Sequence, residues 1–137
     1  MKKLIQLFIF IALGLLATQA WSYQYISAED ARGNLEQQSS MLLVDIQIEP
    51  EFNQHHLPGA LPTYAYPVKS DSDRSKLAAL LPQLQDSTAP VVVVCPRGGG
   101  GAKRAYDYLE EQGIAPERLF ILEKGQQGWP YPELLAQ

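Results

Sequence analysis

The sequence has one cysteine, a shortage of positive charge and no long hydrophobic run beyond its first twenty residues. With only Cys95 among 137 residues, the chain can form no internal disulfide, no zinc site built from several cysteines and no CxxC redox pair. Eleven Lys and Arg stand against fifteen Asp and Glu, which argues against a protein that binds nucleic-acid phosphates through clustered cations. What remains is an acidic domain with a single thiol.

The one long apolar run lies in residues 1–20, which are typical of a signal peptide. Two lysines precede Leu4–Leu16, a run too short for a membrane-spanning helix of about 20 residues. Small residues then allow cleavage after Ala20 or Ser22, which would leave 21–137 as a single domain. The alternative is an uncleaved anchor that tethers the same domain. We expect a secreted protein, periplasmic in a bacterial host. Without the two lysines, nine basic residues face fifteen acidic ones, a net charge of −6.

Short apolar segments alternate with helical ones along the rest of the chain. Val91–Val94 is the strongest strand signal, because it is apolar at every position, as a strand buried on both faces must be. The alternation predicts an α/β three-layer sandwich with a mostly parallel central sheet and helices on both faces. The predicted strands are 41–45, 60–61, 91–94 and 119–122, and the predicted helices are 28–37 (N-cap Ser27), 50–53, 74–81 (N-cap Asp73, stopped by Pro82) and 102–112.

The most distinctive segment, CPRGGGG, follows the strand Val91–Val94. Binding sites in parallel sheets lie at the carboxyl ends of the strands, where Cys95 falls. The glycines Gly98–Gly101 can turn successive N–H groups towards one point and form an anion-binding nest, to which the next helix adds its positive end. These groups favour thiolate over thiol. Most free cysteines are small buried hydrophobes, but this position and this loop favour a reactive one.

Positively charged side chains accompany the loop. Arg97 stands within it and is the preferred cation for a donor anion, and Lys103 and Arg104 follow on the predicted helix. We therefore assign catalysis to Cys95 and substrate binding to five loop residues, namely Arg97, Gly98, Gly99, Gly100 and Gly101.

Other polar residues are expected to be structural. Asp45 ends a predicted strand, where an Asp side chain commonly accepts hydrogen bonds from nearby backbone N–H groups. His55 and His56 are adjacent and have no third ligand beside them, so they do not indicate a metal site.

Several motifs occur in the order that is typical of the rhodanese family, the single-domain sulfurtransferases. They resemble, in turn, the family's strand ending in Asp, its EF…GHIPGA stretch, its CxxG nucleophile loop and its LxGGxxxW tail. The matching segments are Leu43–Asp45, Glu51–Phe52, His56–Ala60, Cys95–Gly98 and Leu122–Trp129.

The resemblance implies a two-step sulfur transfer. The Cys95 thiolate would take the outer sulfur of thiosulfate or a similar small donor anion, and the Cys95 persulfide would pass it to a thiophilic acceptor such as cyanide, a thiol or a protein. It implies neither a metal nor an organic cofactor. No nucleic-acid partner is expected, and no membrane partner beyond the possible anchor. The oligomeric state is not indicated.

The sequence departs from the family pattern in ways that keep alternatives open. The family's Asp-x-Arg is Asp45-Ile46-Gln47 here, and Lys124 replaces the first glycine of the tail. Cys-dependent phosphatases of this fold carry an Arg six residues after the cysteine, where this chain has Gly101. Without that bidentate clamp for phosphate, phosphatase or arsenate reductase activity ranks below sulfur transfer. The remaining alternative is a carrier that holds sulfur or selenium without turnover.

Overall fold

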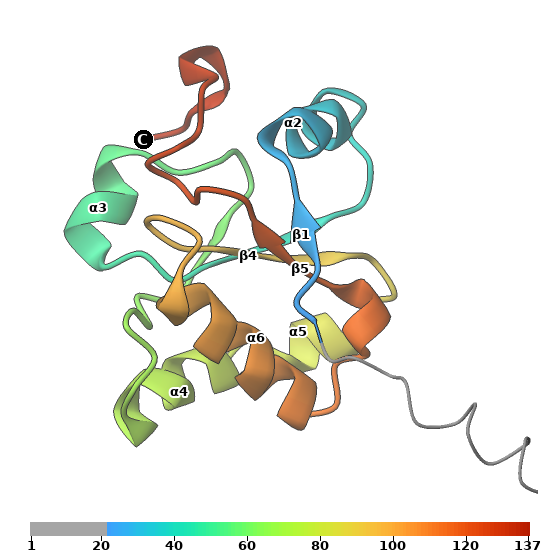
Figure 1. Ribbon diagram of the computed structural model, residues 1–137, viewed down its shortest axis with the longest axis vertical. Helices are drawn as coiled ribbons and strands as arrows, with labels where there is room; N and C mark the ends of the chain where they lie inside the picture. The colour runs from blue at the N-terminus through green and yellow to red at the C-terminus, as the bar shows by residue number, and fades with distance from the viewer. Residues whose placement is uncertain (1–21) are drawn as a thin grey trace, which may run out of the picture.

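The computed structural model describes residues 22–137, in which five parallel strands form a sheet of order β1-β5-β4-β2-β3 (Figure 1). The sheet lies between two layers of helices, which confirms the predicted α/β sandwich. The export signal and its cleavage after Ala20 lie outside the described residues. The strands are β1 (Tyr25–Ile26), β2 (Leu42–Asp45), β3 (Leu61–Pro62), β4 (Val91–Val94) and β5 (Leu119–Leu122).

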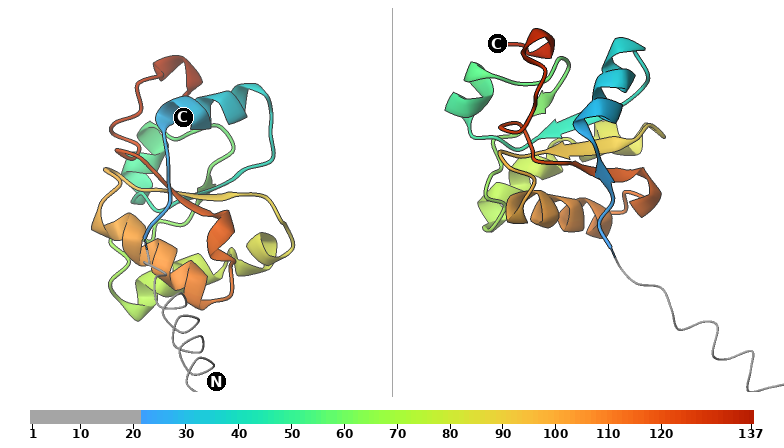
Figure 2. Two further views of the ribbon diagram at one scale, coloured as in Figure 1. Left: turned by 45° about the vertical axis from the view of Figure 1, so that its right-hand side comes forward. Right: turned by 45° about the horizontal axis from the view of Figure 1, so that its top comes forward.

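The helices divide between the two faces of the sheet (Figures 1 and 2). Two helices and the C-terminal segment cover one face, and the other three cover the opposite face. The first group is α2 (Ala28–Glu36) and α3 (Glu49–Gln54), and the second is α4 (Asp71–Ala78), α5 (Leu81–Gln85) and α6 (Gly100–Glu111). Short 3-10 turns, η1 (Pro116–Arg118) and η2 (Pro132–Leu134), complete the chain.

Capping residues explain where the helices begin. The Ser27 side chain accepts the Asp30 N–H at 3.0 Å and caps α2 as predicted. The predicted start of α4 was wrong by three residues, because Ser70 and Asp73 each accept the other's backbone N–H in a capping box. Pro82 was expected to end this helix. It stands instead in the first turn of α5, where a proline removes no helical hydrogen bond.

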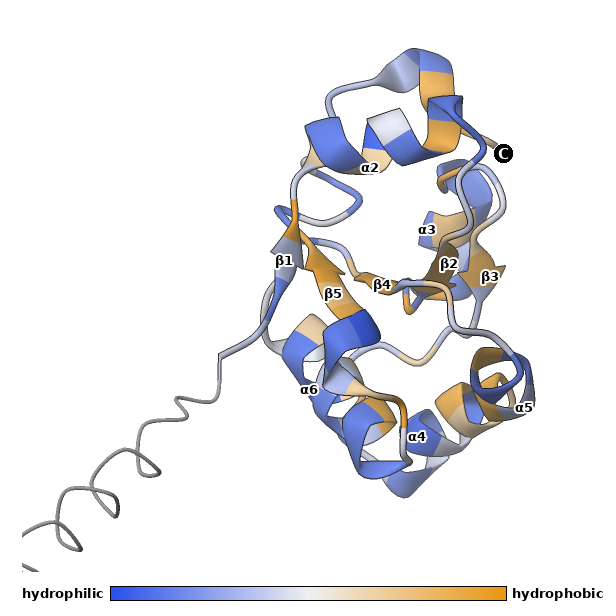
Figure 3. Ribbon diagram, turned by 90° about the vertical axis from the view of Figure 1, so that its right-hand side faces the viewer, coloured by the Kyte–Doolittle hydropathy of each residue, from blue (hydrophilic) through white to orange (hydrophobic). Residues whose placement is uncertain are grey.

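The core is built on both sides of β4, whose four valines are all buried. Val91 and Val93 pack in the cluster under α4, α5 and α6, whereas Val92 and Val94 pack in the cluster under α2. Figure 3 shows these central strands as strongly hydrophobic and the outer helical surfaces as mixed. Because side chains alternate along a strand, Cys95 joins the α6 side.

No helix within residues 22–137 combines the length and the apolar composition that crossing a membrane requires. The C-terminal segment packs beside α3, since Ala136 and His56 exchange backbone hydrogen bonds of 2.8 and 3.1 Å.

Candidate active site

Cys95 lies immediately after β4, at the carboxyl edge of the sheet. The residue is 2% exposed, and the Gly98 N–H donates to its sulfur at an N–Sγ distance of 2.8 Å. Gly99 and Gly100, farther along the loop, are exposed. The thiol is therefore buried at the edge of the core, and the loop that borders it reaches the surface.

A second loop, Glu123–Gly128 after β5, holds the cysteine loop in place. The Gln126 N–H donates to the Cys95 carbonyl at 2.7 Å, and the Gln127 N–H donates to the Pro96 carbonyl at 2.9 Å. The backbones touch at Gly125, where a Cβ atom would lie 2.6 Å from the Arg97 nitrogen. No side chain fits at this position.

The four consecutive glycines have four different surroundings. Of the four, Gly98 alone has a positive φ, of 75°, and a Cβ there would lie 3.0 Å from the Leu122 carbonyl oxygen. Gly99 has open space around it. A Cβ on Gly100 would lie 2.9 Å from Nη1 of Arg104, and one on Gly101 would lie 2.8 Å from the Tyr66 ring. The expected nest is thus reduced to one turn at Gly98 followed by a helix.

That helix, α6, begins at Gly100 and not at Ala102 as predicted, because two of the glycines adopt helical angles. Its first internal hydrogen bond runs from the Lys103 N–H to the Gly99 carbonyl at 3.2 Å. The N–H groups of Gly100, Gly101 and Ala102 consequently have no partner within the helix. Gly101 and Ala102 are buried, and the helix dipole adds positive potential at the same end. This end of α6 is suited to an anion.

The three cations predicted near the loop separate in the structure. Arg97 is exposed at the loop surface. Lys103 points away, with its Nζ 5.6 Å from the ring centroid of Tyr23. Arg104 reaches back along the helix to Gly100, and its Nε donates to the Pro67 carbonyl at 3.0 Å.

Tyr66, at the edge of the site, was missed by sequence reasoning. Its ring covers Gly101, and the residue remains 40% exposed. The Tyr66 N–H donates to the Ile46 carbonyl at 2.8 Å, which fixes this segment beside the end of β2. No local pattern could have indicated it, because Gly101 lies 35 positions along the chain and meets it only through packing.

Asp45, at the end of β2, is fully buried and faces away from Cys95, into the α2 side. Its carboxylate accepts the Gln47 backbone N–H at 2.9 Å and the Gln47 side-chain Nε2–H at 3.0 Å. Gln47 Nε2 also contacts the His55 carbonyl at 3.2 Å. Burial raises the pKa of Asp45 to about 6, although the two Gln47 hydrogen bonds oppose this rise. The expected structural role of Asp45 is confirmed by these contacts.

Of the two adjacent histidines, His55 is exposed and His56 packs on α3. His56 stacks on Phe52 with ring centroids 4.0 Å apart, and its Nδ1 lies 2.9 Å from the Phe52 carbonyl oxygen. Within residues 22–137, no group of three or more His, Cys, Asp or Glu side chains is arranged to hold a metal ion.

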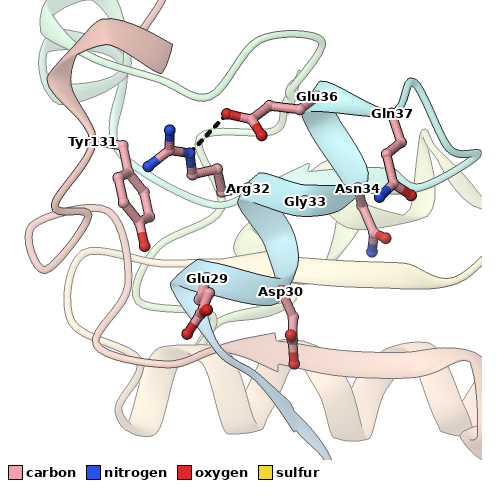
Figure 4. A pocket seen from close by; sticks show the side chains of 8 residues that line it. All are labelled: Glu29, Asp30, Arg32, Gly33, Asn34, Glu36, Gln37 and Tyr131. Atoms are coloured by element: carbon pink, nitrogen blue, oxygen red, sulfur yellow. Dashed lines mark hydrogen bonds and ion pairs between the residues drawn. The ribbon is translucent and has the colours of Figure 1, made fainter.

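A surface hollow of about 580 Å³ lies along α2, on the other face of the sheet from the Cys95 thiol (Figure 4). Arg32 crosses it, with Nε 2.7 Å from a Glu36 carboxylate oxygen and its Cζ atom 4.5 Å from the Tyr131 ring centroid. Its cation is thus already paired with a carboxylate, and the other lining residues at α2 are polar or glycine. The hollow offers no reactive group.

The family model for the rhodanese-like domain matches residues 27–130, which include every segment of the site described above. No match was found among curated proteins.

Several solved structures share the fold at low sequence identity. A thiosulfate sulfurtransferase from Pseudomonas aeruginosa is 20% identical with a TM-score of 0.62, over 86% of this chain and 22% of that one. A yeast protein tyrosine phosphatase of the rhodanese family is 16% identical with a TM-score of 0.64, over 85% and 93%. An As-Sb reductase from Leishmania major is 15% identical with a TM-score of 0.59, over 83% and 85%. One architecture thus serves three named chemistries.

Proposed function

The chain belongs to the rhodanese-like domain family, and we propose that it is an exported sulfurtransferase in which Cys95 carries sulfane sulfur as a persulfide. The donor is thiosulfate or a similar small anion, and the acceptor is thiophilic. The observation that carries the proposal is the hydrogen bond from the Gly98 N–H to the Cys95 sulfur at the start of α6. A charged sulfur at this point is stabilised by the backbone itself.

The reaction divides into two displacements. The Cys95 thiolate attacks the outer sulfur of thiosulfate, a new S–S bond forms, and sulfite leaves with the electron pair of the old S–S bond. The acceptor, cyanide or a thiolate, then attacks the terminal sulfur of the persulfide and leaves as thiocyanate or a new persulfide. The thiolate of Cys95 is regenerated, so no external oxidant or reductant is consumed.

The geometry supports charge on the terminal sulfur as well as on the thiolate. A persulfide extends one atom beyond the Cys95 sulfur, which the Gly98 N–H already contacts. The N–H groups of Gly100 and Gly101 have no partner within α6, and we assign them as the donors to that second sulfur. Donors of this kind, fixed before the reaction, stabilise developing charge without reorganisation.

The burial of Cys95 restricts what reaches it. Because Cys95 is only 2% exposed, we expect a reactant with a single narrow reactive atom, such as the outer sulfur of thiosulfate, to react better than a bulky one. The same burial protects a lone thiol from oxidation to sulfenic and sulfinic acids, which follows thiolate exposure.

The experiment is intact-mass measurement after incubation with thiosulfate. Because the chain has one cysteine, the wild type should gain a single sulfur and Cys95→Ser none. Thiocyanate formation on adding cyanide then identifies an enzyme, whereas a stable persulfide without turnover identifies a carrier of sulfur or selenium. If the wild type gains no sulfur, sulfur transfer through Cys95 is wrong.

Release of phosphate from an aryl phosphate tests the phosphatase alternative. This substrate is chosen because the yeast protein that shares the fold is a tyrosine phosphatase. We expect no activity above the Cys95→Ser background, because Gly101 stands where such enzymes carry a clamping arginine. Arsenate reduction is tested with the same pair of proteins and the same expectation.

Export rests on the sequence of residues 1–20. N-terminal sequencing of protein recovered outside the cytoplasm should begin at Trp21 or Tyr23. Either end keeps the contacts that start the domain, because the Tyr23 hydroxyl donates to Asp107 at 2.9 Å. Recovery of an unprocessed chain in the membrane fraction would favour the anchor.

A further inference from the structure

The side chain of Arg104 lies where a side chain on Gly100 would begin. A Cβ atom built on Gly100 would be 2.9 Å from Nη1 of Arg104 and 3.6 Å from Cζ and Nη2. Gly100 opens α6 and Arg104 follows one turn later. Side chains on a helix lean towards its N-terminus. The guanidinium therefore sits at the start of the helix, beside the fifth residue after Cys95.

The surrounding loop holds Arg104 in this position. Its Nε donates to the Pro67 carbonyl at 3.0 Å in a partly buried contact. In residues 22–137, no carboxylate lies within ion-pair distance of Arg104, whereas Arg32 and Arg74 both have such partners. The terminal nitrogens Nη1 and Nη2 are left as a pair of donors in a planar fork.

This placement opposes the helix dipole, whose positive end disfavours a cation. It also occurs in a domain with an excess of acidic residues. An arginine fixed at the positive end of a helix, without a carboxylate partner, raises the local potential still further. Together with the N–H groups of Gly100 and Gly101, it is arranged to receive an anion of high charge.

We propose that Arg104 binds the oxyanion end of the sulfur donor, and so selects doubly charged donors of the thiosulfate type over singly charged ones. The inference rests on the proposed function. With the outer sulfur on Cys95, the departing sulfite oxygens accept hydrogen bonds from Nη1 and Nη2. The guanidinium that the sequence lacks at position 101 is supplied from the next turn of the helix.

The test compares Arg104→Gln with Lys103→Gln, which removes the same charge from the neighbouring residue on the side facing Tyr23. Two donors are used with cyanide as acceptor: thiosulfate, and methanethiosulfonate, in which a methyl group replaces one charged oxygen. We expect Arg104→Gln to raise KM for thiosulfate by about tenfold and KM for methanethiosulfonate much less. Lys103→Gln should change neither by more than about twofold.

A second variant, Gly100→Ala, keeps every charge and moves the guanidinium, since its Cβ would meet Nη1 of Arg104. It should shift donor preference in the same direction as Arg104→Gln, and it serves if that variant folds poorly. The proposal is overturned if Arg104→Gln matches Lys103→Gln with thiosulfate, or if it weakens both donors equally.

Binding without turnover separates this proposal from the proposed function. In a Cys95→Ser background no sulfur can be transferred, and thiosulfate should raise the melting temperature. That rise should disappear when Arg104→Gln is added and persist when Lys103→Gln is added. If the wild type fails to form a persulfide, sulfur transfer is wrong, but this measurement still decides whether Arg104 binds the anion.

Discussion

Two neighbouring strands, β2 and β4, end at the same edge of the sheet. The carboxyl group at the end of β2 and the thiol after β4 have very different surroundings. Asp45 on β2 is fully buried, and both donors of Gln47 satisfy its carboxylate. Cys95 after β4 faces the other layer and receives one N–H, beside a loop whose glycines reach the surface. The buried Asp45 carboxylate has its hydrogen bonds satisfied and serves the structure. The loop after Cys95 has N–H groups without partners and lies near the surface, which suits it to bind a reactant.

The largest effect is expected from Gly125→Ala, which breaks the support of the Cys95 loop. A Cβ there would lie 2.6 Å from the Arg97 nitrogen and 2.7 Å from the Gly98 nitrogen, and φ is 61°. Since both neighbours are backbone, the loops must separate, and we expect a loss of about 3 kcal/mol or more in the free energy of unfolding. Urea denaturation measures it.

Gly33→Ala is the matched control, because that glycine lies inside α2 with nothing within 4 Å of a Cβ. It should raise the free energy of unfolding by about 0.5–1 kcal/mol. Similar stabilities for the two variants would show that the loop contact at Gly125 is dispensable.

The Asp45 end of the comparison predicts how stability depends on pH. Because the pKa of Asp45 is raised from 3.8 to about 6 in the folded protein, the folded state binds this proton more tightly than the unfolded state. The contribution of this proton to the free energy of unfolding is fully present below pH 4. About 2–3 kcal/mol is lost as the pH rises through 6. Asp45→Asn should lack this dependence, so unfolding of both proteins from pH 4 to 7.5 should diverge across that window. Parallel curves would contradict the assignment.

Gln47→Leu tests the hydrogen bond to Asp45 directly. It removes the Nε2–H donor from the buried carboxylate and keeps the side chain at a similar size. We expect a loss of about 1–3 kcal/mol at pH 7.5. The loss should be smaller at pH 5, because protonation of Asp45 removes the charge that needs the donor. An equal loss at both pH values would mean that Gln47 acts through packing alone.

The smallest effect is expected at Lys124, a non-glycine residue with φ of 61° next to Gly125. Lys124→Gly should raise the free energy of unfolding by about 1 kcal/mol, since the left-handed conformation disfavours a side chain. Gln38→Gly, at a φ of 53° after α2, should behave alike far from the Cys95 loop. Destabilisation at Lys124 alone would show that its side chain supports the site.

Much of the architecture could be read from local patterns. The strands Val91–Val94 and Leu119–Leu122 were predicted at their observed bounds, because each is a short, wholly apolar run between turn residues. The cap of α2 at Ser27 was predicted from one side chain. The two-residue strand β1 was missed, because it is held by pairing with β5 and not by its own sequence.

The site was predictable only in part. The sequence places Cys95 correctly at a strand end, but it predicts that the four glycines form one anion-binding nest. In the structure each glycine has a different surrounding. In chain order, they form a turn, lie in open space, contact the Arg104 guanidinium and contact the Tyr66 ring. These differences depend on the segments 66–67 and 122–125, which are far away in the sequence.

The sequence by itself determined that a lone thiol ends a buried parallel strand and precedes a helix, because strand and helix patterns depend on near neighbours along the chain. Only the tertiary structure decided which neighbours each of these side chains and glycines contacts. Contacts between distant segments bury Asp45 against Gln47, press Gly125 onto the Cys95 loop and turn Arg104 back to Gly100. Close packing sets these positions, and a pattern of residue types carries no record of the space that a neighbouring segment will fill.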